Sequence, residues 1–208
     1  KEIEGELKYA VRRQEETIYH RQLKMTSPAL NRFRDLVLYN LEAGQAVLTD
    51  NNDIRIYTDG KEKFHGLIEE MKRAKKYIHV QYYIIRNDEV WQDIEKVLIE
   101  KAHEGVEVRV LFDSMGCRTM HKRDWDRLKC EGIRVAEFFP AILGQLQMRV
   151  NYRNHRKIVV IDGKVGFVGG FNVGREYIGK DEKFGYWRDT HLCIEGAAVT
   201  SLAVRFVL

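Results

Sequence analysis

The sequence predicts an α/β protein in which a mixed β-sheet is sandwiched between helices, with an N-terminal helical extension. Apolar runs rich in β-branched residues alternate with segments whose apolar residues recur every three or four positions, which indicates strands alternating with helices. An Asp162-Gly163 pair directly follows one apolar run and predicts a hairpin, so at least one pair of strands is antiparallel. A chain of 208 residues is long enough to bury a substantial core.

Residues 1–44 are predicted to be helical and separate from the main domain, which we expect to span residues 45–208. The first part of this segment is dense in charged, helix-forming residues. Ser27 and Pro28 are typical of an N-cap followed by the first helical position, and Gly44 is expected to end this second helix.

The main domain is predicted to alternate strands and helices along its length. The pattern YIHVQYYII at 77–85 is the strongest strand, and the fully apolar run at 158–161 is typical of a strand buried on both faces. The remaining expected elements are strands near 54–56, 106–112, 133–139 and 190–194, a turn at Asp59-Gly60, and helices near 64–71, 90–103, 125–131 and 197–208.

The most informative segment is NYRNHRKIVVIDGKVGFVGGFN, residues 151–172. It holds His155, Lys157 and Asp162 in the order H-x-K-x4-D, followed by a Gly-Gly-Phe-Asn turn. Because strand side chains alternate, an imidazole and an ammonium two residues apart on the predicted strand point to the same face. Attack on a phosphodiester needs such a pair, a nucleophile beside a cation that neutralises the phosphate oxygens.

The neighbouring polar residues suit a phosphate site. Asn172 offers an amide donor, and Gly169 and Gly170 would let the backbone approach a phosphate closely. Arg153 flanks the motif and either attracts an anionic head group or belongs to a solvated face. Asp162 either contacts the reacting groups or serves only the turn that follows it.

The order H-x-K-x4-D followed by G-G-x-N resembles the signature of the phospholipase D superfamily, the HKD motif. From about Val47 onward, the chain resembles the first catalytic half of the bacterial cardiolipin synthases, a family with a mixed sheet sandwiched by helices. The segments that carry this resemblance are GVEVRVL at 105–111, NHRK at 154–157, GGFNVGREY at 169–177 and WRDTH at 187–191.

The resemblance implies roles for individual residues. His155 would form a phosphohistidine with the substrate, or act as the general acid for a partner motif, while Lys157 and Asn172 would bind the phosphate. Asp189 matches the acidic residue that orients the histidine in relatives. The alternative for Asp189 is a surface carboxylate paired with Arg188.

The resemblance also changes the interpretation of two motif residues. Many relatives carry Ser at the position of Gly170, so a backbone N–H would have to replace a hydroxyl contact here. The family role of Asp162 is structural more than catalytic.

Several further polar residues have two interpretations. His79 and His191 are predicted to be packed strand residues rather than ligands. Asp113 follows a strand, where α/β sheets place ligand loops, but a plain turn is equally consistent. Gln81 and Tyr83 either approach the site or belong to the core, with the core favoured.

The resemblance implies phosphatidyl transfer between two phosphatidylglycerol molecules, giving cardiolipin and glycerol through a phosphohistidine. The implied partners are phosphatidylglycerol, an anionic membrane surface and a second HKD half, from the same polypeptide or a second copy, and no nucleic acid. No cofactor and no metal are expected, because Lys157 and Asn172 meet the phosphate charge and no ligand cluster is visible.

The chain starts without Met and stops inside an apolar helical pattern, so we expect a segment of a longer protein. Residues 1–44 would then lead to a membrane anchor, with the whole protein at the cell membrane, its catalytic part on the cytoplasmic side and this segment soluble. This segment would be inactive without a second motif. Three widely spaced cysteines fit no zinc pattern or disulfide framework and favour a reducing compartment.

Two other functions stay open at this point. One is a homodimeric single-motif phosphodiesterase, nuclease or phospholipase D hydrolase, although no clear groove of cations and stacking aromatics is visible. The other is a non-catalytic membrane-docking half-domain that keeps the motif for folding, with the apolar stretch 138–143 against lipid or a partner half.

Overall fold

The computed structural model describes residues 2–19, 31–138 and 153–207, and its centre is a seven-stranded mixed sheet in the order β1-β7-β6-β5-β2-β3-β4. Strands β2, β3 and β4 are parallel to one another, and the other neighbours are antiparallel. The predicted α/β class with a mixed sheet is therefore confirmed. The strands are β1 (Asn52–Asp59), β2 (Tyr77–Tyr82), β3 (Glu107–Asp113), β4 (Arg134–Phe138), β5 (Ile158–Ile161), β6 (Val165–Gly169) and β7 (Arg188–Gly196).

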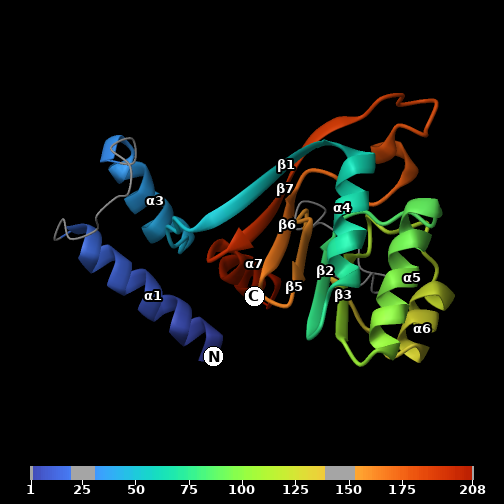
Figure 1. The fold of residues 1–208 in the computed structure, drawn as a ribbon, viewed down its shortest axis with the longest axis horizontal. Coiled ribbons are helices and arrows are strands. Elements are labelled where there is room, and N and C mark those ends of the chain that lie inside the picture. Colours follow the sequence, from blue (N-terminus) through green and yellow to red (C-terminus); the bar gives the residue numbers. More distant parts are fainter. Residues whose placement is uncertain (1, 20–30, 139–152, 208) are drawn as a thin grey trace, which may run out of the picture.

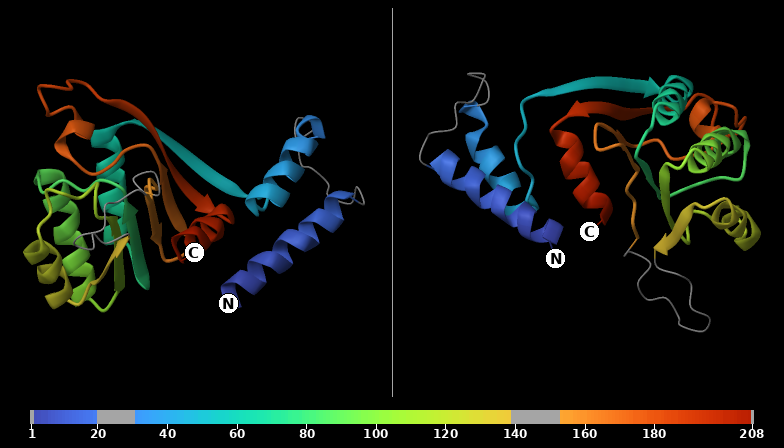
Figure 2. Two further views of the ribbon diagram at one scale, coloured as in Figure 1. Left: turned by 180° about the vertical axis from the view of Figure 1, so that it is seen from behind. Right: turned by 60° about the horizontal axis from the view of Figure 1, so that its bottom comes forward.

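Helices cover both faces of this sheet (Figure 1). α4, α5 and α6 lie on one face and α7 lies on the other, an arrangement that the two views of Figure 2 also show. The described helices are α1 (Glu2–Tyr19), α3 (Arg34–Gly44), α4 (Gly60–Lys72), α5 (Glu89–His103), α6 (Lys122–Cys130) and α7 (Ala198–Val207), with a short 3₁₀ helix η1 (Arg175–Ile178).

Strand β5 is buried on both faces, which explains why its sequence is apolar at every position. Val159 and Ile161 join the large core beneath α4 and α5, whereas Ile158 and Val160 pack in a smaller cluster with Val199 of α7. Each β5 side chain is at most 4 % exposed. Burial of one such side chain is worth about 1.5–3 kcal/mol, so the strand is a stiff support for the residues that precede it.

The predicted hairpin at Asp162-Gly163 is confirmed. Asp162 and Gly163 have φ values of 54° and 68°, and the N–H of Lys164 donates to the carbonyl of Ile161 across 2.9 Å. Two consecutive left-handed residues are the signature of a type I′ turn, which matches the twist of the strands it joins. The turn sends β6 back along β5 and returns the chain to the edge of the sheet where β5 begins.

One predicted boundary is wrong and one is confirmed. Asp59-Gly60 is not a turn, because the Asp59 carboxylate caps α4 by accepting hydrogen bonds from the backbone N–H groups of Lys61 (2.8 Å) and Glu62 (3.2 Å). Gly44 is the last residue of α3, as predicted, and the left-handed residue that follows it is Gln45, with a φ of 48°.

The N-terminal helices α1 and α3 pack on each other through a small cluster around Val11 and Leu41. They lie beyond the β1 end of the sheet, away from α5 and α6 (Figure 1). Within the described ranges, no helix combines the length and apolar character needed to span a bilayer. The predicted helix start at Ser27-Pro28 and most of the stretch 138–143 lie outside the described residues.

Candidate active site

The site forms at the edge of the sheet where β5 begins and β2 ends. The antiparallel pairing of these strands places Ile158 opposite Gln81, so the residues before Ile158 lie beside the carboxyl end of β2. The prediction that His155 and Lys157 lie on the strand is wrong. Pairing between β5 and β2 stops at Ile158, and residues 153–157 form no ladder.

His155 and Lys157 nevertheless meet. The Lys157 Nζ lies 2.9 Å from Nδ1 and 3.2 Å from Nε2 of His155, and it donates a 2.8 Å hydrogen bond to the His155 carbonyl oxygen. Lys157 is buried, whereas the imidazole is exposed and packs on Tyr83 with ring centroids 4.4 Å apart. A fixed cation thus supports a histidine that remains open to a ligand.

Burial sets the charge state of both groups. Desolvation, assisted by the charge of Lys157 and opposed by Asp113, lowers the pKa of His155. Desolvation also lowers the pKa of Lys157 to about 8, against the opposing charge of Asp189. Near pH 7 the pair is therefore a neutral imidazole beside an ammonium, and a neutral imidazole has the free lone pair of a nucleophile.

Asn172 is held at the same edge. Its Oδ1 accepts a hydrogen bond from the Ile84 N–H at 3.1 Å, and its Nδ2 donates to the Tyr177 hydroxyl at 2.9 Å. One Nδ2 hydrogen remains for a ligand. Two consecutive residues after β2 thus contact the site residues, Tyr83 the imidazole of His155 and Ile84 the amide of Asn172. Tyr177 is a site residue that the sequence analysis did not identify.

Asp113 and Arg153 anchor the segment that carries His155. The Asp113 carboxylate accepts hydrogen bonds from Met115 N–H (2.9 Å) and Asn154 N–H (3.4 Å), and lies 3.9 Å from the Arg153 guanidinium. The Arg153 side chain is 8 % exposed and donates to Ser114 Oγ at 3.3 Å. Arg153 is therefore not on a solvated face, and its contacts hold the motif segment in place.

Gly169 and Gly170 lie where the strands pack closely. A Cβ on Gly169 would collide with His191 of β7, and one on Gly170 would collide with the Asp189 carboxylate. The Gly170 N–H already donates to the Thr190 carbonyl at 2.9 Å, so it is not the free donor that was expected. The missing side chains make room for β7.

The predicted hydrogen bond between Asp189 and His155 is not formed in the described part of the chain. Asp189 Oδ1 accepts from the Thr190 N–H at 2.7 Å, and the carboxylate packs against Gly170. Its influence on the site is electrostatic, through the charge that it presents to Lys157.

Asp162 lies at the far end of β5 from His155. Its carboxylate accepts three backbone hydrogen bonds, from the N–H groups of Lys75 (2.8 Å), Lys76 (2.7 Å) and Tyr77 (2.9 Å). The structure does not bring this residue to the imidazole. Asp162 fixes the connection between α4 and β2, which supports the structural interpretation over a catalytic contact.

A buried polar group lies beneath α4. His191 is confirmed as a packed strand residue: it is fully buried, and neither ring nitrogen has a hydrogen-bond partner among the described residues. Lys63 of α4, which the sequence analysis overlooked, is also fully buried and donates to the Tyr82 hydroxyl at 2.8 Å. Desolvation, with the charges of Lys63 and Lys157, lowers the pKa of His191 to about 2.

The family described as "Cardiolipin synthase, PLD-like domain" matches residues 67–188, which include the His155, Lys157 and Asn172 cluster. The chain belongs to this family. The match covers more than half of the chain and confirms the predicted membership of the phospholipase D superfamily.

Curated relatives carry the same description. The chain is 46 % identical over 202 residues to a cardiolipin synthase of Oceanobacillus iheyensis, covering 97 % of this chain and 42 % of that protein. It is 51 % identical over 177 residues to cardiolipin synthase 2 of Staphylococcus epidermidis, covering 85 % of this chain and 36 % of that protein. The chain thus spans about two fifths of the length of these relatives.

Solved structures share the fold at low sequence identity. Nuc from Salmonella typhimurium, a phospholipase D family member, aligns with a TM-score of 0.55 at 15 % identity, over 76 % of this chain and 93 % of that one. Phosphatidylserine synthase from Haemophilus influenzae aligns with a TM-score of 0.56 at 19 % identity, over 74 % of this chain and 35 % of that one. These likenesses confirm the predicted phospholipase D-like fold.

Proposed function

We propose that residues 45–208 form one catalytic half of a cardiolipin synthase, which transfers a phosphatidyl group between two phosphatidylglycerol molecules and releases glycerol. The observation that carries this proposal is the contact between the exposed neutral imidazole of His155 and the buried ammonium of Lys157. The relatives named cardiolipin synthase support the choice of substrate.

The geometry supports a two-step reaction. A ring nitrogen of His155 attacks phosphorus, a P–N bond forms, and the P–O bond to the leaving glycerol breaks. The Lys157 ammonium and the Asn172 amide hydrogen offset the charge that grows on the phosphate oxygens. The hydroxyl of a second phosphatidylglycerol then attacks phosphorus and releases the histidine, so that cardiolipin forms without net consumption of water.

The leaving glycerol oxygen needs a proton, and the second nucleophile must lose one. We propose that a histidine of a second HKD half carries this proton, and that the same pair of halves, at an anionic membrane surface, binds both lipids. Residues 1–44 would link this half to a membrane anchor. The 208-residue chain alone would then be inactive unless two copies pair about a two-fold axis.

Replacing His155 tests the proposal. We expect His155→Ala, in the whole polypeptide that contains this chain, to lower cardiolipin formation from phosphatidylglycerol vesicles by roughly 10³-fold or more, because a covalent nucleophile or its proton donor is lost. Lipid products are separated by chromatography, and released glycerol is measured alongside.

A matched control is His103→Ala. His103 is an exposed histidine on α5 that pairs with Glu131 at 2.7 Å, away from the site. This variant should retain full activity. Cardiolipin formation that survives His155→Ala, or cleavage of DNA in place of lipid transfer by the unmodified protein, would contradict the proposal.

A further inference from the structure

A concave site lies next to the His155 segment. It is a cavity of about 420 Å³ enclosed by the loop after β3, the helix α6 and the strand β4. β3 and β4 are parallel, and their carboxyl ends meet at this edge of the sheet, where open α/β sheets usually bind ligands. The volume falls within the range of small-molecule sites.

The floor of the cavity is apolar. Phe112, Met120 and Trp125 line it and are each at most 7 % exposed, and Val135 of β4 adds a fourth apolar side chain. The Phe112 and Trp125 rings stack with centroids 4.0 Å apart. Such a floor offers nothing to a bare inorganic anion but packs well against carbon chains.

The rim of the cavity is cationic. Three exposed basic side chains line it, Arg118, Lys122 and Lys129, against the two carboxylates of Asp126 and Glu137. Lys129 is neutralised by Asp126 at 3.4 Å. Within the described ranges, no carboxylate forms an ion pair with Arg118 or Lys122, so these two cations are available to an anion.

The cavity and the proposed nucleophile are joined through two consecutive residues. Ser114 lines the cavity, and its hydroxyl oxygen accepts a hydrogen bond from the Arg153 guanidinium. The Asp113 carboxylate accepts a hydrogen bond from the backbone N–H of Asn154, the residue before His155. A ligand that touches Ser114 in the cavity would therefore touch a residue that is itself hydrogen-bonded to the motif segment.

We propose that this cavity binds an anionic phospholipid, with its phosphodiester between Arg118 and Lys122 and its glycerol carbons and first acyl methylenes on Trp125 and Phe112. The choice of a phospholipid rests on the proposed phosphatidyl transfer. A lipid held there can present its hydroxyl-bearing head group toward the His155 segment, which assigns the cavity to the lipid that accepts the phosphatidyl group.

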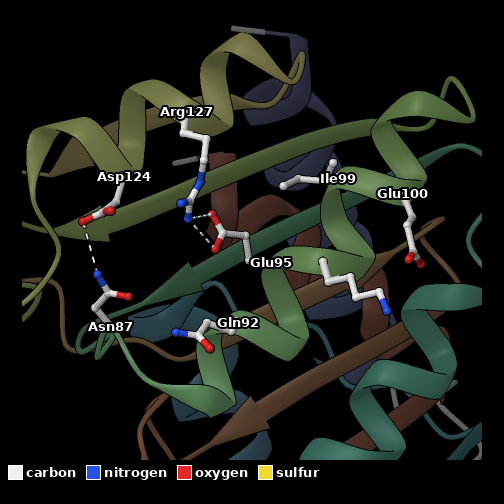
Figure 3. Close-up of a pocket in the computed structure, with 8 residues that line it drawn as sticks. Asn87, Gln92, Glu95, Ile99, Glu100, Asp124 and Arg127 are labelled. Carbon is white, nitrogen blue, oxygen red and sulfur yellow. Dashed lines mark hydrogen bonds and ion pairs between the residues drawn. The ribbon is translucent and has the colours of Figure 1, made fainter.

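A second groove on the same side of the sheet provides a contrast (Figure 3). It has about 480 Å³ between α5 and α6, and its central charges face each other. Arg127 donates two hydrogen bonds to the Glu95 carboxylate, at 2.6 and 2.8 Å, and the Asn87 amide donates to Asp124 at 3.3 Å. Its central charges are paired with each other, so it serves as a control surface.

The test is an NMR titration of the 208-residue chain with dihexanoyl-phosphatidylglycerol below the concentration at which that lipid forms micelles. We expect shifts at the Trp125 indole N–H and the Arg118 backbone. The double variant Arg118→Gln/Lys122→Gln should weaken binding about ten-fold, because two charge-assisted contacts are lost. The matched double variant Lys96→Gln/Arg123→Gln removes equal charge from the other groove and from an α6 position outside the cavity, and should leave binding unchanged.

Parallel titrations with dihexanoyl-phosphatidylcholine and with inorganic phosphate separate the sources of binding. Equal binding of phosphatidylcholine would contradict the requirement for an anionic ligand. Equal binding of inorganic phosphate would contradict the proposal that the ligand is a lipid. Shifts confined to His155 and Tyr83 would defeat the cavity proposal but leave the transfer reaction standing. Lipid binding in the cavity, together with full activity of His155→Ala in the whole polypeptide, would defeat the proposed transfer reaction but leave the cavity as a lipid site.

Discussion

Substitution of Asp162 separates a chemical role from a structural role for the last residue of the H-x-K-x4-D pattern. Its carboxylate accepts hydrogen bonds of 2.7–2.9 Å from three backbone N–H groups, of Lys75, Lys76 and the first residue of β2, Tyr77, and its φ of 54° is left-handed. Alanine can supply none of these bonds and tolerates this backbone conformation poorly. We therefore expect Asp162→Ala to lose stability without losing the His155 site.

The magnitude follows from these contacts. Two of the three donors lie in exposed surroundings, so each bond is worth about 1 kcal/mol rather than the larger value of a buried charged hydrogen bond. With about 1 kcal/mol for the left-handed backbone, Asp162→Ala should cost about 3–4 kcal/mol. Asp162→Asn keeps one acceptor and the backbone preference, so it should cost about 1–2 kcal/mol. Domains of this kind are stable by only about 5–15 kcal/mol.

Urea denaturation at pH 7 measures these differences, with Asp93→Ala on the exposed face of α5 as the control. Burial raises the pKa of Asp162, but the backbone hydrogen bonds outweigh this effect and hold its pKa below the usual value. The stabilisation is therefore complete above the unfolded-state pKa of about 3.9 and is lost as pH falls through the folded-state pKa. The gap between the unmodified protein and Asp162→Asn should stay constant from about pH 7 to 5 and close below about pH 4.

An Asp162→Ala protein with an unchanged urea midpoint would refute this reasoning. A variant that folds with normal stability but loses cardiolipin formation would restore a direct catalytic role to the carboxylate.

Three further predictions concern the site and its support. Because the pKa of Lys157 is about 8, calorimetric binding of tungstate, a phosphate analogue, should weaken as pH rises from about 7 to 9, and Lys157→Arg should remove that dependence. Burial lowers the pKa of His191 to about 2, so below about pH 6.5 the unfolded chain takes up a proton that the folded chain does not. The free energy of unfolding should therefore fall between about pH 7 and 5, and His191→Leu should reduce this pH dependence. Gly170→Ala should displace the Asp189 carboxylate and lower the free energy of unfolding by about 1–3 kcal/mol in denaturation experiments. This loss should be smaller in an Asp189→Ala background, and an equal loss in both backgrounds would show that the two residues do not touch.

The fold class was predictable because its signals are local. The IVVI run and the Asp162-Gly163 pair give the buried strand and the hairpin by composition and dihedral preference alone. The contact between His155 and Lys157 was also predicted, since the two residues are close in sequence. The strand boundary was not predicted, because pairing with β2, a distant segment, decides it and ends at Ile158.

Other features of the site depend on contacts between distant segments. Tyr83 and Ile84 join the imidazole to Asn172 across more than seventy positions of sequence. No local pattern distinguishes Lys63 from the exposed lysines around it, yet Lys63 is buried beside Tyr82. Such contacts follow from the order of strands in the sheet, and periodicity does not specify that order.

By itself, the sequence determined that this protein carries a mixed sheet and a histidine–lysine pair suited to phosphate chemistry, since both depend on neighbouring residues. Only the tertiary structure decided what the other motif residues do. It placed the Asp162 carboxylate against the backbone N–H of Tyr77 at the start of β2 and packed the Asp189 carboxylate against Gly170. It also formed a cavity with cationic and apolar lining residues beside the His155 segment. These assignments required three-dimensional contacts, because each joins parts of the chain that only the sheet brings together.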